Sequence, residues 1–353
     1  MRHTPLVAAL LLLSGAAPGQ SRQTSFDLSG AGIDSARIAE LFERTSKGEF
    51  PGVDGIVIAR HGVVVAESYF NGYSADRRHD TRSATKSVTS LLVGIAIDQK
   101  QLSLDTSVVA FFPDYRPAGG WDSARSELRL RDLLTMRTGL ACNDFVDESP
   151  GNEEGMYPKA DWTRFFLEIP DAPEHAGERF SYCTAGVMLA GELLARAVHR
   201  PVADFAEEKL WRPLGISGAA WARTPTGSAR TGGNLELTPR EMVKVGQLML
   251  DKGRVRGRQV VSSGWLEQSC SPQVDESDTR YRYGFLWWLG NPQTDDPALP
   301  SCHASGNGGQ KIFVLPTADL VVVFTGSSYN KARYSHQQPV LLLNRFILPA
   351  LTS

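Results

Sequence analysis

The sequence predicts an α+β fold whose sheet is mainly antiparallel and is built from strands near both ends of the chain. Two β-branched hairpin patterns lie far apart, one over residues 55–70 and the other over residues 311–325. Helical periodicity dominates between them, and no alternating strand–helix repeat indicates a parallel sheet. We therefore expect remote strands to complete one sheet flanked by helices, with a mostly helical lobe inserted over roughly residues 100–235.

The individual elements follow from local patterns. The N-terminal hairpin is expected to turn at residues 60–62 and the C-terminal hairpin at residues 317–319. The aromatic segment 283–288 also has strand character. Apolar residues at helical spacing predict helices over residues 33–47, 86–99, 130–136, 162–167, 184–197, 202–210, 239–251, 263–269 and 337–348.

Composition limits the class of protein and its partners. The chain has 353 residues, 42% of them hydrophobic, and a formal net charge of −2. That length buries a large core in one elaborate domain or in two closely packed ones. The near-neutral net charge shows no excess of basic residues of the kind that nucleic-acid binding requires. Beyond the N-terminus, no stretch is long and apolar enough for a membrane helix, so we expect no membrane span in the mature chain.

The first residues have the pattern of a secretory signal peptide. Arg2 and His3 precede an apolar run that is too short to span a bilayer, and small residues follow it. We expect cleavage after Ala16 or Gly19, which makes residues 1–19 the leader and the mature protein periplasmic or secreted. The alternative is an uncleaved apolar N-terminus on a cytosolic protein.

The segment 82–97 holds the pattern Ser-x-x-Lys at the start of a long apolar run. Ser83 and Lys86 share one face of a helix, which brings the serine hydroxyl beside the lysine amine. A serine in the first turn also has its backbone N–H at the positive end of the helix dipole. These conditions suit a nucleophile that attacks a carbonyl carbon. The pattern recurs at Ser328 and Lys331, but there it leads into polar residues, and we interpret it as coincidence.

Two further segments carry candidate chemistry. Tyr182 lies where a loop enters the helix expected over 184–197, and a tyrosine near a lysine can act as general base towards a serine. The alternative is a packed aromatic side chain. Residues 303–310 are rich in glycine, so their backbone is expected to approach a neighbour closely and to lend an N–H to an oxyanion. The alternative there is a glycine-rich turn.

Four cysteines, at positions 142, 183, 270 and 302, permit two disulfides in an exported chain. No pair has C-x-x-C spacing, so we expect no metal site. Three pairings are possible. We put forward Cys142–Cys183, because both residues flank candidate active-site segments, and buried free thiols are the alternative.

Taken in order, these segments resemble the class C-like branch of the serine β-lactamase and penicillin-binding superfamily, whose signatures include S-x-x-K and K-T-G. Segments 130–140, 231–242 and 283–288 resemble that branch as well, so the likeness extends from Val53 to the C-terminus. It implies one β-lactamase-like serine hydrolase domain over residues 20–353, with no cofactor.

The resemblance also implies the roles of individual residues. Ser83 corresponds to the acyl-forming nucleophile, Lys86 to its activating partner and Tyr182 to the general acid and base. The backbone N–H groups of Ser83 and of the Gly306–Asn307 region correspond to the oxyanion hole.

Two departures from the family pattern bear on the substrate. Thr184 replaces the asparagine of the usual Tyr-x-Asn motif. The third motif lacks its lysine, since His303 or Ala304 stands in that place, depending on the register. In the family, that lysine helps to hold the carboxylate of a penicillin or of a peptide C-terminus.

The missing lysine favours ester or small amide bonds over β-lactams, as in the esterases of this superfamily and the 6-aminohexanoate-dimer hydrolases. We therefore predict a serine hydrolase that acts on a small-molecule ester or amide through a covalent acyl-enzyme on Ser83. The alternatives are a β-lactamase or D-Ala-D-Ala carboxypeptidase, and a catalytically silent cell-wall binding protein. No G-x-S-x-G or H-E-x-x-H motif supports a different hydrolase framework.

Overall fold

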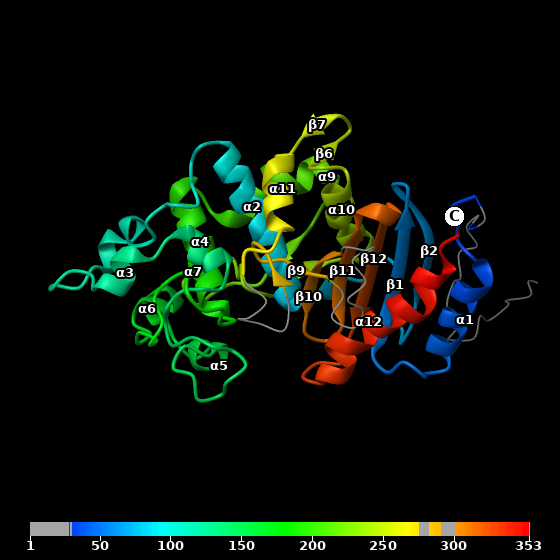
Figure 1. Ribbon diagram of the computed structural model, residues 1–353, viewed down its shortest axis with the longest axis horizontal. Helices are drawn as coiled ribbons and strands as arrows, with labels where there is room; N and C mark the ends of the chain where they lie inside the picture. The colour runs from blue at the N-terminus through cyan, green and yellow to red at the C-terminus, as the bar shows by residue number, and fades with distance from the viewer. Residues whose placement is uncertain (1–27, 29, 275–281, 291–300, 353) are drawn as a thin grey trace, which may run out of the picture.

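The computed structural model describes residues 28, 30–274, 282–290 and 301–352. Its centre is an antiparallel sheet with the strand order β2-β1-β12-β11-β10-β9-β8. The two hairpins pair directly, through β1 and β12, although they come from opposite ends of the chain (Figure 1). The predicted α+β fold class is therefore confirmed. The strands are β1 (Val53–Arg60), β2 (Val63–Tyr69), β8 (Arg282–Tyr283), β9 (Trp288–Leu289), β10 (Cys302–Gly306), β11 (Gln310–Leu315) and β12 (Leu320–Gly326).

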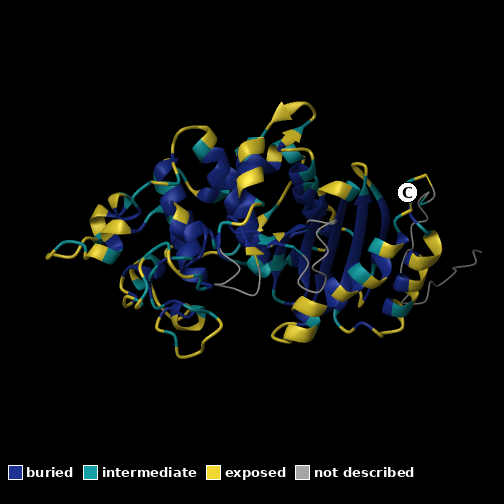
Figure 2. Cartoon of the chain, viewed as in Figure 1, coloured by how far each residue is buried: buried dark blue, intermediate teal, exposed yellow. Residues whose placement is uncertain are grey.

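The central strands are buried on both faces because helices cover each face of the sheet (Figure 2). Successive residues of a strand point to opposite faces. Ile56 and Ile58 of β1 belong to one apolar cluster, whereas Val57 and Ala59 belong to the other. This two-sided burial explains why β1, β11 and β12 read as near-continuous apolar runs.

Elements from both ends of the chain cover the first face (Figure 1). α1 (Ser35–Ser46) buries Ile38 and Leu41 there. The structure corrects the single helix expected over residues 337–348, because residues 333–350 form a series of short helical pieces around α12 (Gln338–Leu342). Prolines at positions 339 and 349 interrupt the regular pattern of α-helical backbone hydrogen bonds, since proline has no backbone N–H to donate.

The second face is covered by α2 (Thr85–Asp98), α10 (Pro239–Leu250) and α11 (Ser263–Ser269). α2 is buried along almost its whole length. Gly94 lets α11 pack directly on it, because a Cβ at that position would lie 2.2 Å from Cδ1 of Trp265. Close packing on several sides fixes α2, and with it the chemistry at its N-terminus.

Between α2 and α10 most of the regular elements are helices. These helices are α3 (Ser123–Glu127), α4 (Leu130–Leu134), α5 (Glu153–Met156), α6 (Trp162–Leu167), α7 (Thr184–Ala197), α8 (Val202–Ala206) and α9 (Arg212–Leu214). The helix expected over 202–210 ends early as an α-helix and continues as a π-type turn over Glu207–Trp211. A small sheet formed by β3 (His79–Asp80), β5 (Leu235–Leu237) and β4 (Ala220–Trp221) was not predicted, since such short strands show no periodicity.

Two expectations near the C-terminus also change. The aromatic segment 283–288 is not one strand but a tight hairpin between β8 and β9, with Leu286 at a φ of +60°. The glycine-rich segment begins as strand β10, and its turn starts only after Gly306. The sequence missed β10 because glycine and serine have low strand propensity.

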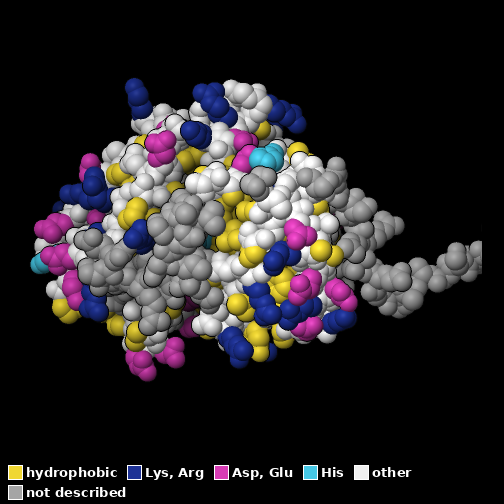
Figure 3. Space-filling view, turned by 45° about the vertical axis from the view of Figure 1, so that its right-hand side comes forward, with side chains coloured by type: hydrophobic (Ala, Val, Ile, Leu, Met, Phe, Trp, Pro, Cys, Tyr) yellow, Lys and Arg dark blue, Asp and Glu magenta, His cyan; other side chains and the backbone are white. Residues whose placement is uncertain are grey.

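The predicted leader, residues 1–19, lies outside the described residues. Within the part that the structure describes, no helix is long and apolar enough to cross a membrane. On the face shown in Figure 3, acidic and basic side chains are interspersed, as the near-neutral net charge suggests.

Candidate active site

Ser83 lies in a 3₁₀ turn, Arg82–Ala84, that leads directly into α2. Lys86 is in the first turn of α2, and its Nζ donates a hydrogen bond to Ser83 Oγ over 3.1 Å. The first N–H groups of a helix have no partner within it, so the backbone N–H of Ser83 can bind an oxyanion. The structure thus brings a hydroxyl, an amine and the backbone N–H of Ser83 together at one helix end.

The residue before the nucleophile is strained. Arg82 has a φ of +49°, which is rare for a residue other than glycine. Asp80 holds this conformation by accepting hydrogen bonds from the N–H of Arg82 over 2.8 Å and from Asn234 Nδ2 over 2.7 Å. A left-handed residue costs about 1–3 kcal/mol, and such strain clusters at functional sites.

Lys86 is only 1% exposed, yet its Nζ is fully engaged. Besides Ser83 it contacts Thr184 Oγ1 over 3.0 Å and the carbonyl oxygen of Gly232 over 2.6 Å. These three acceptors match the three protons of a lysine ammonium, so the group is held in one position. Thr184 supplies an acceptor oxygen, which is what an asparagine amide would offer at the same place.

Tyr182 lies over Lys86, whose Nζ is 5.0 Å from the centroid of the tyrosine ring. The ring stacks with both Phe145 and Trp288, with centroid distances of 5.1 and 5.8 Å. Among the described residues, the Tyr182 hydroxyl has no hydrogen-bond partner, so the expected contact with Ser83 is not formed. Both side chains line one cavity, and catalytic contacts of this kind often tighten only with substrate. Of the adjacent tryptophans, Trp287 is fully buried and Trp288 lines this cavity.

The third motif ends beside the nucleophile. A Cβ on Gly306 would lie 2.2 Å from the carbonyl oxygen of Thr81 and 3.2 Å from the nitrogen of Ala84. Only glycine lets β10 approach this closely. If Gly306 is aligned with the glycine of Lys-Thr-Gly, Ala304 occupies the lysine position. His303 lies further back on β10, where it packs on Phe313 with ring centroids 5.3 Å apart.

Asn307 follows Gly306 and lines the same cavity as Ser83. Its side chain is fixed on both sides, since Nδ2 donates to Asn330 over 2.6 Å and Oδ1 accepts from the N–H of Asn330 over 2.9 Å. Ser335 Oγ also donates to Oδ1, over 3.1 Å. These contacts hold the backbone of Asn307 still, as an oxyanion donor requires.

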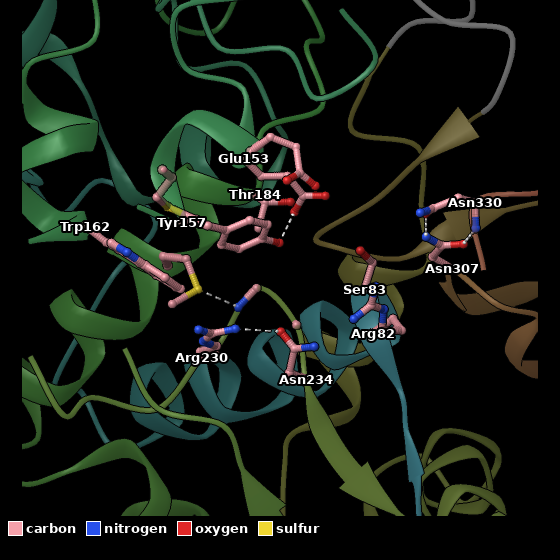
Figure 4. Close-up of a pocket in the computed structure, with 15 residues that line it drawn as sticks. Arg82, Ser83, Glu153, Tyr157, Trp162, Thr184, Arg230, Asn234, Asn307 and Asn330 are labelled. Atoms are coloured by element: carbon pink, nitrogen blue, oxygen red, sulfur yellow. Dashed lines mark hydrogen bonds between the residues drawn. The ribbon is translucent and has the colours of Figure 1, made fainter. Parts of the chain in front are cut away.

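Ser83 opens onto two adjoining hollows, of about 990 and 360 Å³. Figure 4 shows Ser83 between Glu153 and Tyr157 on one side and Asn307 and Asn330 on the other. Glu153 and Tyr157 belong to the polar loop over residues 143–160, where Glu153 accepts a hydrogen bond from Tyr157 Oη over 2.9 Å. The loop thus forms one wall of the site. Together the two hollows have room for a small organic substrate on either side of the nucleophile.

The sequence did not single out Asp144, which lies in that loop. Its Oδ2 accepts a hydrogen bond from the N–H of Thr184 over 2.7 Å, and its Oδ1 accepts one from the N–H of Glu153 over 2.9 Å. Asp144 therefore fixes the start of α7, which carries a partner of Lys86. Burial, helped by the nearby charge of Glu153, raises the pKa of Asp144 to about 6, against the opposing effect of Lys86.

We expect Asp144 to make stability depend on pH. Its pKa is higher in the folded chain, about 6, than its ordinary 3.8, so folding favours the protonated carboxyl. The contribution of Asp144 to stability is then greatest below pH 4 and is lost as the pH rises through 6, by about 3 kcal/mol. Urea unfolding of the wild type and of Asp144→Asn at pH 4 and pH 7 measures this. Relative to Asp144→Asn, the wild type should have a lower free energy of unfolding at pH 7 than at pH 4. A difference in this free energy that is the same at both pH values would contradict the prediction.

Two disulfides cross-link the described chain, Cys142–Cys183 and Cys270–Cys302. The first joins the polar loop to the segment that holds Tyr182 and Thr184, since Cys183 lies between them. The second joins the end of α11 to the start of β10. Their closed loops are similar, with sequence separations of 41 and 32 residues.

We expect removal of either disulfide to cost stability, but only the first to lower activity. Replacing either cysteine pair by alanine should cost about 2–4 kcal/mol, because the loops are of similar length. The Cys142→Ala/Cys183→Ala variant should also lose about tenfold in kcat/KM, since Tyr182 and Thr184 are positioned through that bond. The Cys270→Ala/Cys302→Ala variant is the matched control. Equal activity losses in the two variants, assayed well below their Tm, would argue against this role.

A sequence model of the family described as Beta-lactamase matches residues 38–342. The chain belongs to the β-lactamase family. A curated relative in this family, the 6-aminohexanoate-dimer hydrolase of Paenarthrobacter ureafaciens, is 28% identical over 293 residues, which cover 76% of this chain and 71% of the relative. The resemblance inferred from the ordered motifs is therefore confirmed, and the chain is a β-lactamase-family hydrolase.

Solved structures of the family share the fold. A family VIII carboxylesterase superimposes with a TM-score of 0.68 at 16% identity, covering 90% of this chain and 98% of the esterase. A penicillin-binding protein homologue from Caulobacter crescentus has a TM-score of 0.66 at 18% identity, covering 87% of this chain and 95% of the other. A penicillin-binding protein homologue and an esterase are thus neighbours of this chain in fold, and a 6-aminohexanoate-dimer hydrolase is a relative in sequence.

Proposed function

We propose that this β-lactamase-family hydrolase cleaves an ester or a small amide through a covalent acyl-enzyme on Ser83. The contact between Lys86 Nζ and Ser83 Oγ, at the N-terminus of a buried helix, is the observation that carries the proposal. The cavity beside Ser83 has room for a small substrate, and the family includes an esterase and an amide hydrolase.

In the proposed first step, Ser83 Oγ attacks the carbonyl carbon, and its proton passes to the oxygen of Tyr182, the general base, whose negative charge the Lys86 ammonium neutralises. The backbone N–H groups of Ser83 and Asn307 stabilise the negative charge on the carbonyl oxygen. When the carbon–oxygen or carbon–nitrogen bond of the substrate breaks, the leaving group takes up that proton. Water then attacks the acyl carbon with the same groups in reverse, which releases the acid and restores Ser83.

A fluorophosphonate probe tests the nucleophile directly. We expect one covalent addition per chain, located by peptide mass spectrometry on Ser83. Absence of labelling under any condition would overturn the proposal in favour of a catalytically silent binding protein. Labelling at a different serine would refute the assignment of Ser83.

A substrate panel tests the bond class. 4-Nitrophenyl acetate and butyrate, the linear dimer of 6-aminohexanoate and the cephalosporin nitrocefin cover esters, a small amide and a β-lactam. We expect turnover of an ester or of the amide to exceed that of nitrocefin, because Ala304 or His303 stands where the family has its lysine. Faster turnover of nitrocefin would favour the β-lactamase or D-Ala-D-Ala carboxypeptidase alternative.

We also propose that the protein is exported to the periplasm or secreted. The signal-peptide pattern of residues 1–19 and the two disulfides support this, since disulfides persist in oxidising compartments. Fractionation of a bacterial host that expresses the full chain, followed by N-terminal sequencing, is the test. We expect processing after Ala16 or Gly19, and an unprocessed cytoplasmic protein would contradict export.

A further inference from the structure

The wall of the larger cavity contains a buried lysine that the proposed mechanism does not use. Lys311 lies on β11, directly opposite Ser305 of β10, and its side chain is only 3% exposed. Its Nζ donates a hydrogen bond to Ser305 Oγ. Lys311 and Ser305 line the same cavity as Ser83.

Lys311 has no counter-ion within the part of the chain that the structure describes. Among the described residues, no carboxylate lies within ion-pair distance of its Nζ, and Ser305 is its hydrogen-bond partner. A buried lysine without an acidic partner is rare, because an unpaired charge is costly to desolvate. Burial lowers the pKa of Lys311 to about 7. A bound anion raises this pKa again, because it stabilises the charged form, so the anion binds to a charged amine.

A second buried polar group beside Lys311 also lacks a partner. His303 is 5% exposed and lines the cavity, and its Nδ1 has no hydrogen-bond partner among the described residues. Burial, together with the nearby Lys311, lowers the pKa of His303 well below its ordinary value, so this imidazole is neutral. A neutral imidazole can donate one N–H to an anion.

The opposite wall of the cavity is acidic. Asp147 and Glu153 of the polar loop line it. Lys311 and His303 lie on the strand wall, and Lys331 and His336 also line the cavity, from the segment after β12. An anionic substrate group is therefore drawn to the strand wall and repelled from the loop wall. Gly306 abuts the turn that holds Ser83, and Ser305 and Lys311 line the cavity onto which Ser83 opens.

We propose that Lys311, Ser305 and His303 form a carboxylate-binding subsite, so that the preferred substrate carries a carboxylate close to its scissile bond. The subsite rests on the proposed function, because it selects the substrate that Ser83 attacks. The third motif lacks its lysine in the sequence. Lys311 of the neighbouring strand supplies an amine opposite Ser305, on the other face of the sheet from Ala304. Side chains directly opposite each other on two antiparallel strands have Cβ atoms about 5 Å apart, which lets the amine of Lys311 contact Ser305 Oγ.

Two substrate pairs test the subsite, each pair differing only in a charge. 4-Acetoxybenzoate and its methyl ester vary the leaving group, whereas mono-4-nitrophenyl glutarate and its methyl ester vary the acyl group. We expect the wild type to prefer the carboxylate by at least about tenfold in kcat/KM in one pair, which also reveals the side on which the subsite lies. No preference for the carboxylate in either pair would overturn the proposal.

The Lys311→Met variant should abolish this preference, mainly through a higher KM for the carboxylate, and Lys311→Arg should retain part of it. Ser305→Ala, a milder change, should reduce the preference without abolishing it. Lys331→Met is the matched control, since Lys331 is an exposed lysine at the rim of the same cavity. If Lys331→Met and Lys311→Met lost the preference equally, the preference would come from the overall positive charge near the cavity. That result would overturn the subsite.

Failure of the subsite and failure of the proposed function give different results. If fluorophosphonate labels Ser83 and the neutral esters are hydrolysed, but Lys311→Met keeps the wild-type preference, only the subsite is refuted. If Ser83 is not labelled and none of the four esters is hydrolysed, the proposed function is refuted as well. Should Lys311→Met fail to fold, Lys311→Arg and Ser305→Ala still decide the question, because an unchanged preference in both would refute the subsite.

Discussion

Replacing Ser83 by alanine is expected to abolish hydrolysis. The change removes the oxygen that forms the acyl-enzyme, and groups that act as a unit lose nearly all of their effect together. We expect kcat on 4-nitrophenyl acetate to fall by at least about 10³-fold, leaving the small rate that binding and oxyanion stabilisation provide. Fluorophosphonate labelling should disappear with it. The fold should remain, since Ser83 lies at the edge of a cavity and its hydroxyl contacts only Lys86 within the described chain.

The chain contains its own control for this experiment. Ser328 and Lys331 repeat the Ser-x-x-Lys spacing, but Ser328 Oγ donates to the carbonyl oxygen of Pro51 over 3.1 Å. Ser328→Ala should therefore cost about 1 kcal/mol of stability and leave turnover within about threefold of the wild type. Full activity of Ser83→Ala, or loss of activity only in Ser328→Ala, would reject Ser83 as the nucleophile.

Replacing Lys86 by methionine is expected to have the second largest effect. Methionine fills a similar volume but donates no hydrogen bond, so Ser83, Thr184 and the carbonyl of Gly232 all lose their common partner. Loss of a group that takes part in proton transfer lowers the rate by about 10²–10⁴-fold. We expect this loss in kcat, together with much slower fluorophosphonate labelling of Ser83.

Lys244→Met is the matched control for Lys86. Lys244 Nζ also donates to a backbone carbonyl, that of Gly215, but it does so at the surface, away from the cavity. Circular dichroism and thermal unfolding should show that both variants are folded. Turnover by Lys86→Met within about tenfold of the wild type would contradict its role, because that falls below the range expected for proton transfer.

The sequence predicted the parts of the molecule that depend on local spacing. The hairpin of β1 and β2 turns where Arg60, His61 and Gly62 interrupt two apolar runs, and α7 spans the residues that helical periodicity indicated. The contact between Ser83 and Lys86 belongs to the same class, because three residues of helix bring them together.

Other parts escaped prediction because the pattern was too short or was ambiguous. β10 contains Ser305 and Gly306, which rarely signal a strand, so a glycine-rich turn remained possible until its ladder with β11 was seen. Asp144 was one acidic residue among several in a polar loop. Its distinction comes from accepting the N–H of Thr184, which lies 40 residues further along the chain.

By itself, the sequence determined the family, the nucleophile candidate and its activating lysine, because each of these depends on the spacing of residues within a single element. Only the tertiary structure decided what surrounds them. The carbonyl of Gly232 beside Lys86, and the amine of Lys311 beside Ser305, depend on how distant segments pack and on strand register. A slip of one residue between β10 and β11 would turn Lys311 to the opposite face of the sheet, and no local pattern fixes that register. The sequence therefore shows a motif without its lysine, whereas the folded chain places a buried amine from the next strand beside Ser305.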